Sequence, residues 1–265
     1  MMRKKFLLAI ALGLMLIFLL VSGLAMAPVL HAVTIYTGTQ PNGNNGPLAQ
    51  VVITPIKDNT LYENTNGTTS NGIGTFFFVG KTSGNSTRRG LLAFDLAGKV
   101  PAGATIVSAT VQLQMSRTSA GVTAIGLHRA LADWGEGTSD ASANEGKGGD
   151  ATTGDATWLH TFHTTATWLT AGGDFVPTAT VTTPVNDIGL YQWRSPGLLA
   201  DVQAWVANPT SNFGWVVVGD ESTAGTAKRF SSRESTTAAN RPQLTIVYTG
   251  GEVVTQAIYL PLVRN

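Results

Sequence analysis

Short apolar runs that recur along most of the chain are the feature that most constrains its fold. From Gln50 onward, runs of about four to eight apolar residues alternate with clusters of Gly, Asn, Ser and Pro. In the clearest run, Ala109, Val111, Leu113 and Met115 alternate with polar residues, as in a strand with one buried face. Further strands are expected at 51–55, 75–79, 90–96, 122–129, 179–183, 214–219, 228–232 and 243–248. About ten strands are too many for one open sheet to bury well, so the sequence predicts an all-β sandwich of two packed sheets.

One short helix is expected near 196–207. Ser195-Pro196 offers an N-cap followed by proline in the first turn, and Asn208-Pro209 ends the segment. Five apolar residues share helical spacing: Leu198, Leu199, Val202, Trp205 and Val206. We expect this helix to connect two strands across one end of the sandwich, with Trp205 in the core.

The composition excludes several classes of protein. Only 12% of the 265 residues are charged, 43% are hydrophobic, 30 are glycine and none is cysteine. The chain is too apolar for a disordered protein, lacks the three-residue glycine period of collagen, and has no disulfide or thiolate chemistry. Gly, Thr, Ser and Asn replace the missing charges, and these residues favour turns and strands in an exported β-rich protein.

The N-terminus resembles an export signal. Arg3, Lys4 and Lys5 precede an uninterrupted run of apolar residues and glycine over 6–21, which is typical of a signal peptide, here ending near Ala32. A membrane anchor retained through residues 6–21 is the alternative, because the run is long for a cleaved signal. Without residues 1–32 the chain has 14 basic and 16 acidic residues, so we expect no nucleic-acid partner.

The two ends of the remaining chain are expected to lie outside the sandwich. Residues 33–49 carry no charge and little apolar pattern, so they are interpreted as a flexible leader. Residues 250–265 follow a Gly-Gly break and end in a short apolar tail, which is too short to cross a membrane. The folded domain is therefore expected at 50–249.

Acidic residues are concentrated in one stretch of the chain. Residues 133–174 contain eight glycines, one lysine and seven of the 16 acidic residues: Asp133, Glu136, Asp140, Glu145, Asp150, Asp155 and Asp174. This stretch is expected to be a long irregular excursion, where binding functions are often found. Its carboxylates suit a structural Ca²⁺ ion or sugar hydroxyls, but a solvated loop without any ligand explains them equally well.

Tryptophans in loop-like sequence are the second candidate binding feature. Trp134 and Trp158 flank parts of the acidic stretch, and an exposed indole can stack on the apolar face of a sugar ring. Burial at the end of the sandwich is the competing interpretation. Enzyme signatures such as a nucleophile elbow, a P-loop or a dinucleotide fingerprint are absent from the sequence.

A series of motifs resembles the DNRLRE domain family of secreted bacterial β-sandwich proteins. The series covers roughly residues 51–249 and consists of Arg88-Arg89-Gly90-Leu91-Leu92-Ala93-Phe94-Asp95-Leu96, His128-Arg129-Ala130-Leu131-Ala132-Asp133-Trp134-Gly135-Glu136-Gly137, Gly154-Asp155-Ala156-Thr157-Trp158, Asp201-Val202-Gln203-Ala204-Trp205, Ala227-Lys228-Arg229-Phe230-Ser231-Ser232-Arg233-Glu234 and Arg241-Pro242-Gln243-Leu244. The string that names the family is missing, and Ser231-Ser232-Arg233-Glu234 is the nearest element. The resemblance implies a jelly-roll-like sandwich related to carbohydrate-binding modules, some of them attached to alginate lyases. Fold transfers better than activity in such comparisons.

The candidate site residues follow from these motifs. The carbohydrate-binding candidates are Trp134, Trp158, His128, Arg229 and Arg233, because guanidinium groups pair bidentately with the carboxylates of an acidic polysaccharide. Arg233 has an alternative role in an ion pair that ties the sheet to the acidic stretch. The candidates for organising the acidic stretch, or for holding Ca²⁺, are Asp133, Glu136 and Asp155.

The sequence therefore predicts an exported, extracellular, non-catalytic protein that binds polysaccharide, with uronate-containing chains as the favoured class. A surface structural or adhesive protein without a sugar ligand is the second hypothesis. A polysaccharide lyase built from histidine, Tyr191 and an arginine is the third.

Overall fold

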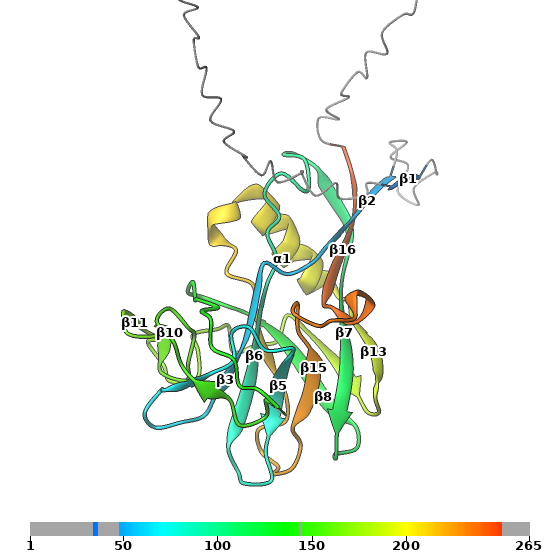
Figure 1. The fold of residues 1–265 in the computed structure, drawn as a ribbon. Coiled ribbons are helices and arrows are strands. Elements are labelled where there is room, and N and C mark those ends of the chain that lie inside the picture. Colours follow the sequence, from blue (N-terminus) through cyan, green and yellow to red (C-terminus); the bar gives the residue numbers. More distant parts are fainter. Residues whose placement is uncertain (1–33, 37–47, 144, 251–265) are drawn as a thin grey trace, which may run out of the picture. The chain divides into compact units, whose positions relative to one another are not determined.

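The computed structural model describes residues 34–36, 48–143 and 145–250 (Figure 1). The expected signal peptide or anchor at 1–32 and nearly all of the C-terminal tail lie outside the described residues. Among the described residues, no helix has both the length and the apolar character needed to cross a membrane.

The described chain forms one 12-stranded antiparallel sheet that curls into two layers, together with two 2-stranded sheets. The predicted all-β sandwich with one short helix is confirmed. Sheet A, as we call the first layer, contains β1 (Thr34–Tyr36), β2 (Leu48–Ile53), β16 (Gln243–Thr249), β7 (Thr105–Thr118), β15 (Lys228–Ser231), β5 (Phe76–Lys81) and β13 (Gly189–Trp193). Sheet B contains β3 (Lys57–Tyr62), β6 (Thr87–Ala93), β14 (Trp215–Val218), β8 (Thr123–Arg129) and β12 (Val181–Val185). Strand β5 joins the two sheets, because it pairs with β15 through most of its length and with β6 through Gly80 and Lys81.

The main apolar core lies between the two sheets. Along β7, Val111, Leu113 and Met115 are fully buried, whereas Gln112 and Gln114 are only half-buried. This alternation confirms that one face of the strand points into the sandwich and the other points outward. Strands of both sheets contribute to the same core cluster, which includes Phe77, Leu92, Ile125, Trp215, Phe230 and Ile246.

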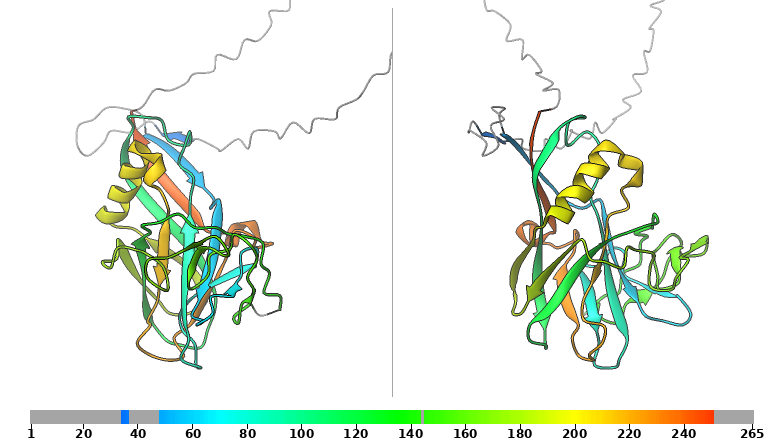
Figure 2. Two further views of the ribbon diagram at one scale, coloured as in Figure 1. Left: turned by 90° about the vertical axis from the view of Figure 1, so that its left-hand side faces the viewer. Right: turned by 180° about the vertical axis from the view of Figure 1, so that it is seen from behind.

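Helix α1 (Pro196–Ala207) forms where the sequence predicts it and covers one end of this core (Figure 2). The Ser195 hydroxyl accepts a hydrogen bond from the Leu198 amide at 3.0 Å and caps the helix. The Trp205 ring lies 4.5 Å from the ring of Trp215, centroid to centroid, and both side chains are buried. The expected core position of Trp205 is therefore confirmed.

Several strands fall where the sequence does not predict them, among them β3, β13 and β1. Strand β3 begins with the polar residues Lys57, Asp58 and Asn59, of which the last two are buried, so it lacks the apolar alternation of a recognisable strand. Strand β13 was not predicted either; it is short, and only Trp193 of its five residues is buried. Strand β1 lies inside the expected flexible leader and pairs with β2 from Thr34 to Tyr36, which corrects the expectation for those three residues.

A second apolar core covers the outward face of sheet B. Residues 130–178, which we call the covering segment, pack Trp134, Ala156 and Trp168 against this face. The strands contribute Leu61, Leu91, Ala93 and Val216. The only strands within the covering segment's described residues are short: β9 (Gly149–Asp150), β10 (His160–Phe162) and β11 (Ala166–Thr167). Figures 1 and 2 show this segment in green beside β3 and β6. The expected excursion is irregular, but it forms a third packed layer.

Replacement of Trp134 tests whether the covering segment belongs to the cooperative fold. We expect Trp134→Ala to lower the free energy of unfolding by about 3–5 kcal/mol, because it empties a fully buried aromatic site. Leu169→Ala is the matched control in the same segment, since Leu169 is 96% exposed, and it should change stability by less than about 0.5 kcal/mol. Urea denaturation measures both values. A loss below about 1 kcal/mol for Trp134→Ala would show that the segment unfolds separately.

Candidate functional site

The structure distributes the residues singled out by the sequence over three places. Arg233, Glu136 and Asp133 lie where β3 meets the covering segment. Arg229 lies on the outward face of sheet A. Trp158 and His128 lie under the far part of the covering segment, close to Phe175 and Arg89. The predicted residues therefore do not form one common surface.

Trp134 is not available to a sugar. Its side chain has no exposed surface, its indole N–H donates to the carbonyl oxygen of Phe213 at 2.9 Å, and the Lys57 ammonium lies 4.4 Å from its ring centroid. The prediction that Trp134 binds carbohydrate is wrong, because the ring anchors the second core instead.

A cluster of three carboxyl groups and one arginine ties the covering segment to the sandwich. We call Asp58, Glu136, Arg233 and Glu234 the carboxylate–arginine cluster. The Arg233 guanidinium donates to both oxygens of Glu136, each at 2.7 Å, and Glu136 also accepts from the Asp58 amide at 2.8 Å. Such a bidentate pair fixes both position and orientation. Of the two roles considered for Arg233, the geometry shows the ion pair.

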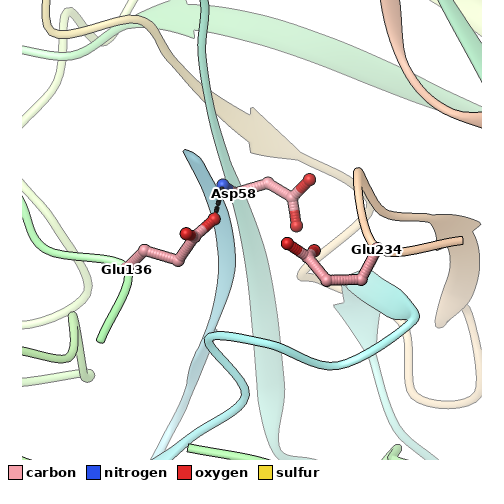
Figure 3. Close-up of side chains that lie close together, drawn as sticks. All are labelled: Asp58, Glu136 and Glu234. Atoms are coloured by element: carbon pink, nitrogen blue, oxygen red, sulfur yellow. Dashed lines mark hydrogen bonds between the residues drawn. The ribbon is translucent and has the colours of Figure 1, made fainter. Parts of the chain in front are cut away.

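Asp58 and Glu234 face each other inside this cluster (Figure 3). Asp58 is 1% exposed, and one of its oxygens accepts from the Arg233 amide at 2.7 Å. Burial raises the pKa of Asp58 well above its ordinary value of 3.8, and the charge of Glu234 raises it further. Burial also raises the pKa of Glu234, although the charge of Arg233 opposes this. The two carboxyl groups thus favour holding a proton.

The cluster does not fit a calcium ion. One oxygen from each of Asp58, Glu136 and Glu234 lies within 4.8 Å of the other two, but Arg233 already occupies their common side. Its Nε is 2.7 Å from Glu136 and 2.9 Å from Glu234. Calcium needs six to eight oxygen ligands, and a divalent cation here would face a guanidinium group and a carboxyl group whose pKa is raised. Arg233 pairs with both oxygens of Glu136 and with one oxygen of Glu234. The other oxygen of Glu234 is buried without a hydrogen-bond partner among the described residues, as expected of a carboxyl group whose pKa is raised.

The three residues expected to organise the covering segment, or to hold calcium, have separate partners. Asp133 pairs with Lys57 at 2.6 Å, and Glu136 pairs with Arg233. Asp155 is fully buried and accepts hydrogen bonds from the Thr152 and Ser139 amides. Each carboxylate therefore has its own protein partners, and no two of them share a ligand site among the described residues.

Carboxylates satisfy the backbone of the covering segment and of the strands beneath it. Six of the seven acidic residues between 133 and 174 accept a hydrogen bond from a backbone amide: Asp133, Glu136, Asp140, Glu145, Asp155 and Asp174. An irregular packed segment lacks strand partners for its N–H groups, and carboxylates supply them. The acidic composition of this segment thus has a structural explanation.

Arg229 presents its guanidinium on the outward face of sheet A. The guanidinium carbon lies 3.7 Å from the centroid of the half-buried Phe76 ring, and Nε donates to the Ser116 hydroxyl at 3.0 Å. Cross-strand pairing places Arg117 of β7 directly opposite Arg229. Burial lowers the pKa of Arg229, and the charge of Arg117 lowers it further, so the two cations lie close enough to repel.

Glu145 is the acidic group that acts on Arg229. Its two carboxylate oxygens already accept several hydrogen bonds. It is 8% exposed. Its two oxygens accept hydrogen bonds from the Thr75 amide and hydroxyl, the Phe76 amide and the Asn71 side chain. Glu145 therefore has little remaining capacity to bond the Arg229 guanidinium.

Trp158 packs against the half-buried Arg89 and His128 packs against Phe175, so the two residues do not form an open platform. Arg89 lies between two rings, with its guanidinium carbon 5.0 Å from the centroid of Trp158 and 5.1 Å from that of Phe175. The His128 ring contacts Phe175 edge to face at 5.3 Å, and its Nδ1 lies 3.0 Å from the carbonyl oxygen of Val176. A groove of about 660 Å³ opens beside Arg89 and Phe175.

Several residues of these sites were missed by sequence reasoning. Asp58 belongs to a strand that the polar sequence concealed, and Arg117 lies on β7 beyond the alternating residues Ala109 to Met115. Arg89 stands in a motif that carries the family resemblance, but no site role was predicted for it or for Phe175. Only the three-dimensional pairing of strands brings these groups together.

Replacement of Asp58 tests the carboxylate–arginine cluster. The folded protein binds the Asp58 proton more tightly than the unfolded chain does, so stability falls as the pH rises from about 3.8 towards the raised pKa. Asp58→Asn keeps an oxygen for the Arg233 amide but removes the titration. We therefore expect its melting temperature to fall less than that of the wild type between about pH 4 and about pH 9.

The comparison between variants isolates this effect from other titrations. The pKa values of Glu63 and Asp220 are lowered, so these groups act in the opposite direction, equally in both proteins. Asp150→Asn, at an exposed position of β9, serves as the control. Parallel melting curves for Asp58→Asn and the wild type across the pH series would contradict the assignment.

Comparison with known proteins adds no family to these observations. A scan against protein-family profiles finds no match, and a search of curated proteins finds none either. The resemblance to the DNRLRE domain family therefore stays a prediction from the motifs. Function has to be argued from the sites themselves.

Proposed function

We propose that this chain is an exported, non-catalytic protein that binds an acidic polysaccharide through the outward face of sheet A. The observation that carries the proposal is the cross-strand pair Arg117 and Arg229, with Arg229 lying flat on Phe76. The basic start and apolar run of residues 1–32 support the export part of the proposal.

The chemistry of this face suits a chain of uronate sugars. A guanidinium group matches a carboxylate bidentately, and Nε of Arg229 is held by Ser116, so its terminal nitrogens are oriented before a ligand arrives. An anion between the two arginines would also relieve the repulsion between them. Phe76 adds an aromatic surface at the same place.

The neighbouring strand positions extend the face with neutral hydrogen-bonding groups. Gln112 and Gln114 of β7 point outward beside Gln192 of β13, whose amide donates to Gln112 at 3.2 Å. Amide side chains of this kind bind sugar hydroxyls. A polysaccharide lying along β7 would therefore contact cations at one end and amides further along.

The two alternatives from the sequence receive less support. A lyase built from histidine and Tyr191 would need both in one site. The Tyr191 hydroxyl, however, bonds to the backbone of Asn186 and Asp187 beside sheet A, while His160 and His163 lie in the covering segment. A structural or adhesive protein without a sugar ligand remains the second hypothesis, and the gel experiment below separates it from the proposal.

Affinity electrophoresis tests the proposal. We expect the wild type to be retarded in gels that contain alginate or pectate. Arg229→Gln should weaken this retardation about tenfold or more, because it removes a charge-assisted pair. Arg229→Lys, which keeps the charge but loses the planar fork and the contact with Phe76, should lie between the two.

Arg194→Gln is the matched control, because it removes the same charge. Arg194 is exposed and directly follows β13, whose last residue, Trp193, pairs with Val111 of β7. Val111 lies six residues before Arg117 on the same strand, so Arg194 is about 20 Å from Arg117. If the wild type is retarded in neither gel, the proposed function is refuted. Equal losses in Arg229→Gln and Arg194→Gln would show that only net charge matters.

A further inference from the structure

The groove beside Arg89 is a second candidate binding site, on a different sheet from the arginine pair. It has a volume of about 660 Å³ and is bounded by Arg89, Leu131, Leu169, Asp174 and Phe175. A groove of this size falls within the range of about 300–1,000 Å³ seen for ligand pockets. Four of these five residues, all except Arg89, belong to the covering segment.

The charges around the groove are paired within the protein. Arg89 donates to both oxygens of Glu221, at 2.7 and 2.8 Å. The two oxygens of Asp174 accept from the amides of Leu169 and Thr170, at 2.8 and 2.9 Å. One cation and two carboxylates give a slightly negative balance, which disfavours an anionic ligand. The nearby pair of Lys57 and Asp133 is also compensated.

Apolar surface and free donor capacity occur together in the groove. Leu131 is 53% exposed and Leu169 is 96% exposed. The half-buried Phe175 lines the same groove, and its ring centroid lies 5.1 Å from the guanidinium carbon of Arg89. Three of the five guanidinium N–H groups of Arg89 are used, by Glu221 and by the carbonyl oxygen of Gly172 at 2.7 Å. Two remain for the oxygen of a ligand or of water.

The wall of the groove is fixed in advance. Gly172 has a φ angle of +89°, and a Cβ atom there would lie 2.5 Å from Arg89 and 2.8 Å from Trp158. Glycine is required at this position for its backbone conformation and for the close approach to both side chains. Arg89 is held between Trp158 and Phe175, so ligand binding would order little that is not already ordered.

We infer that this groove binds an uncharged sugar unit, with the ring on Phe175 and the exposed leucines and a hydroxyl oxygen on Arg89. An uncharged pyranose matches both halves of the wall, because it has apolar ring faces and hydroxyl groups at its edge. The inference goes beyond the proposed function, which uses a positive face on sheet A and an anionic ligand.

Titration with neutral oligosaccharides tests the inference. The probes are hexamers of glucose, mannose and N-acetylglucosamine, followed by calorimetry on the full chain. We expect at least one of them to bind, Phe175→Ala to weaken it about tenfold, and Leu169→Ala to weaken it about threefold. Leu169→Ala is included because its exposed position cannot compromise folding. Arg229→Gln, on the other sheet, should leave this binding unchanged.

The outcomes separate the two proposals. No binding of any neutral hexamer, or equal binding by the wild type and both groove variants, overturns the inference and leaves the alginate result untouched. Loss of neutral binding in Arg229→Gln alone overturns it as well, because it assigns sugar binding to sheet A. Binding of an apolar dye that Phe175→Ala abolishes, without sugar binding, identifies the groove as a site for an apolar ligand and also overturns it.

Discussion

The burial of sheet B on both faces is the constraint on which the rest of the structure depends. Its inward face packs into the core between the sheets through Leu92, Ile125 and Trp215. Its outward face carries Leu61, Leu91 and Val216, which must also be removed from water. A covering layer is therefore obligatory, and the chain provides it with an irregular segment of about fifty residues instead of a third sheet or helices.

An irregular layer brings a second requirement, which explains the placement of charge. Backbone amides that have no strand partner must be hydrogen-bonded in another way. In the covering segment this task falls to carboxylates, as with Asp155 and the Thr152 amide or Asp174 and the Leu169 amide. Sparse charge elsewhere and concentrated acid here thus have one cause, and the carboxylate–arginine cluster joins this layer to the turn after β15.

The consequences for ligand binding differ between the two sheets. On sheet A, Arg117 of β7 and Arg229 of β15 lie opposite each other, beside the half-buried side chains of Gln112 and Gln114. On sheet B, the covering segment and Arg89 border a groove. A pair of arginines suits an acidic chain, whereas a groove with compensated charges suits a single uncharged unit.

Sequence reasoning found the features that depend on local pattern and missed those that depend on packing between distant segments. The alternation along β7 and the capped helix α1 were predictable, because each depends on residues close together in the chain. Strand β3 was not, because Asp58 and Asn59 are buried only through partners such as Arg233 and Ser70, far away in the sequence. Trp134 was assigned to a ligand because nothing local distinguishes an exposed indole from one that anchors a second core.

Hydrogen exchange followed by mass spectrometry tests the central claim, that the covering segment is a packed layer of the fold, most directly. We expect the hydrogen-bonded amides of the covering segment to exchange on the time scale of global unfolding, as the amides of β6 and β14 do. These amides include those of Gly135, Ala156, His163 and Trp168. Exchange of these amides within seconds, while β6 and β14 stay protected, would show that the segment is a mobile loop. In that case the second core, the groove and the structural role of the carboxylates would all have to be abandoned.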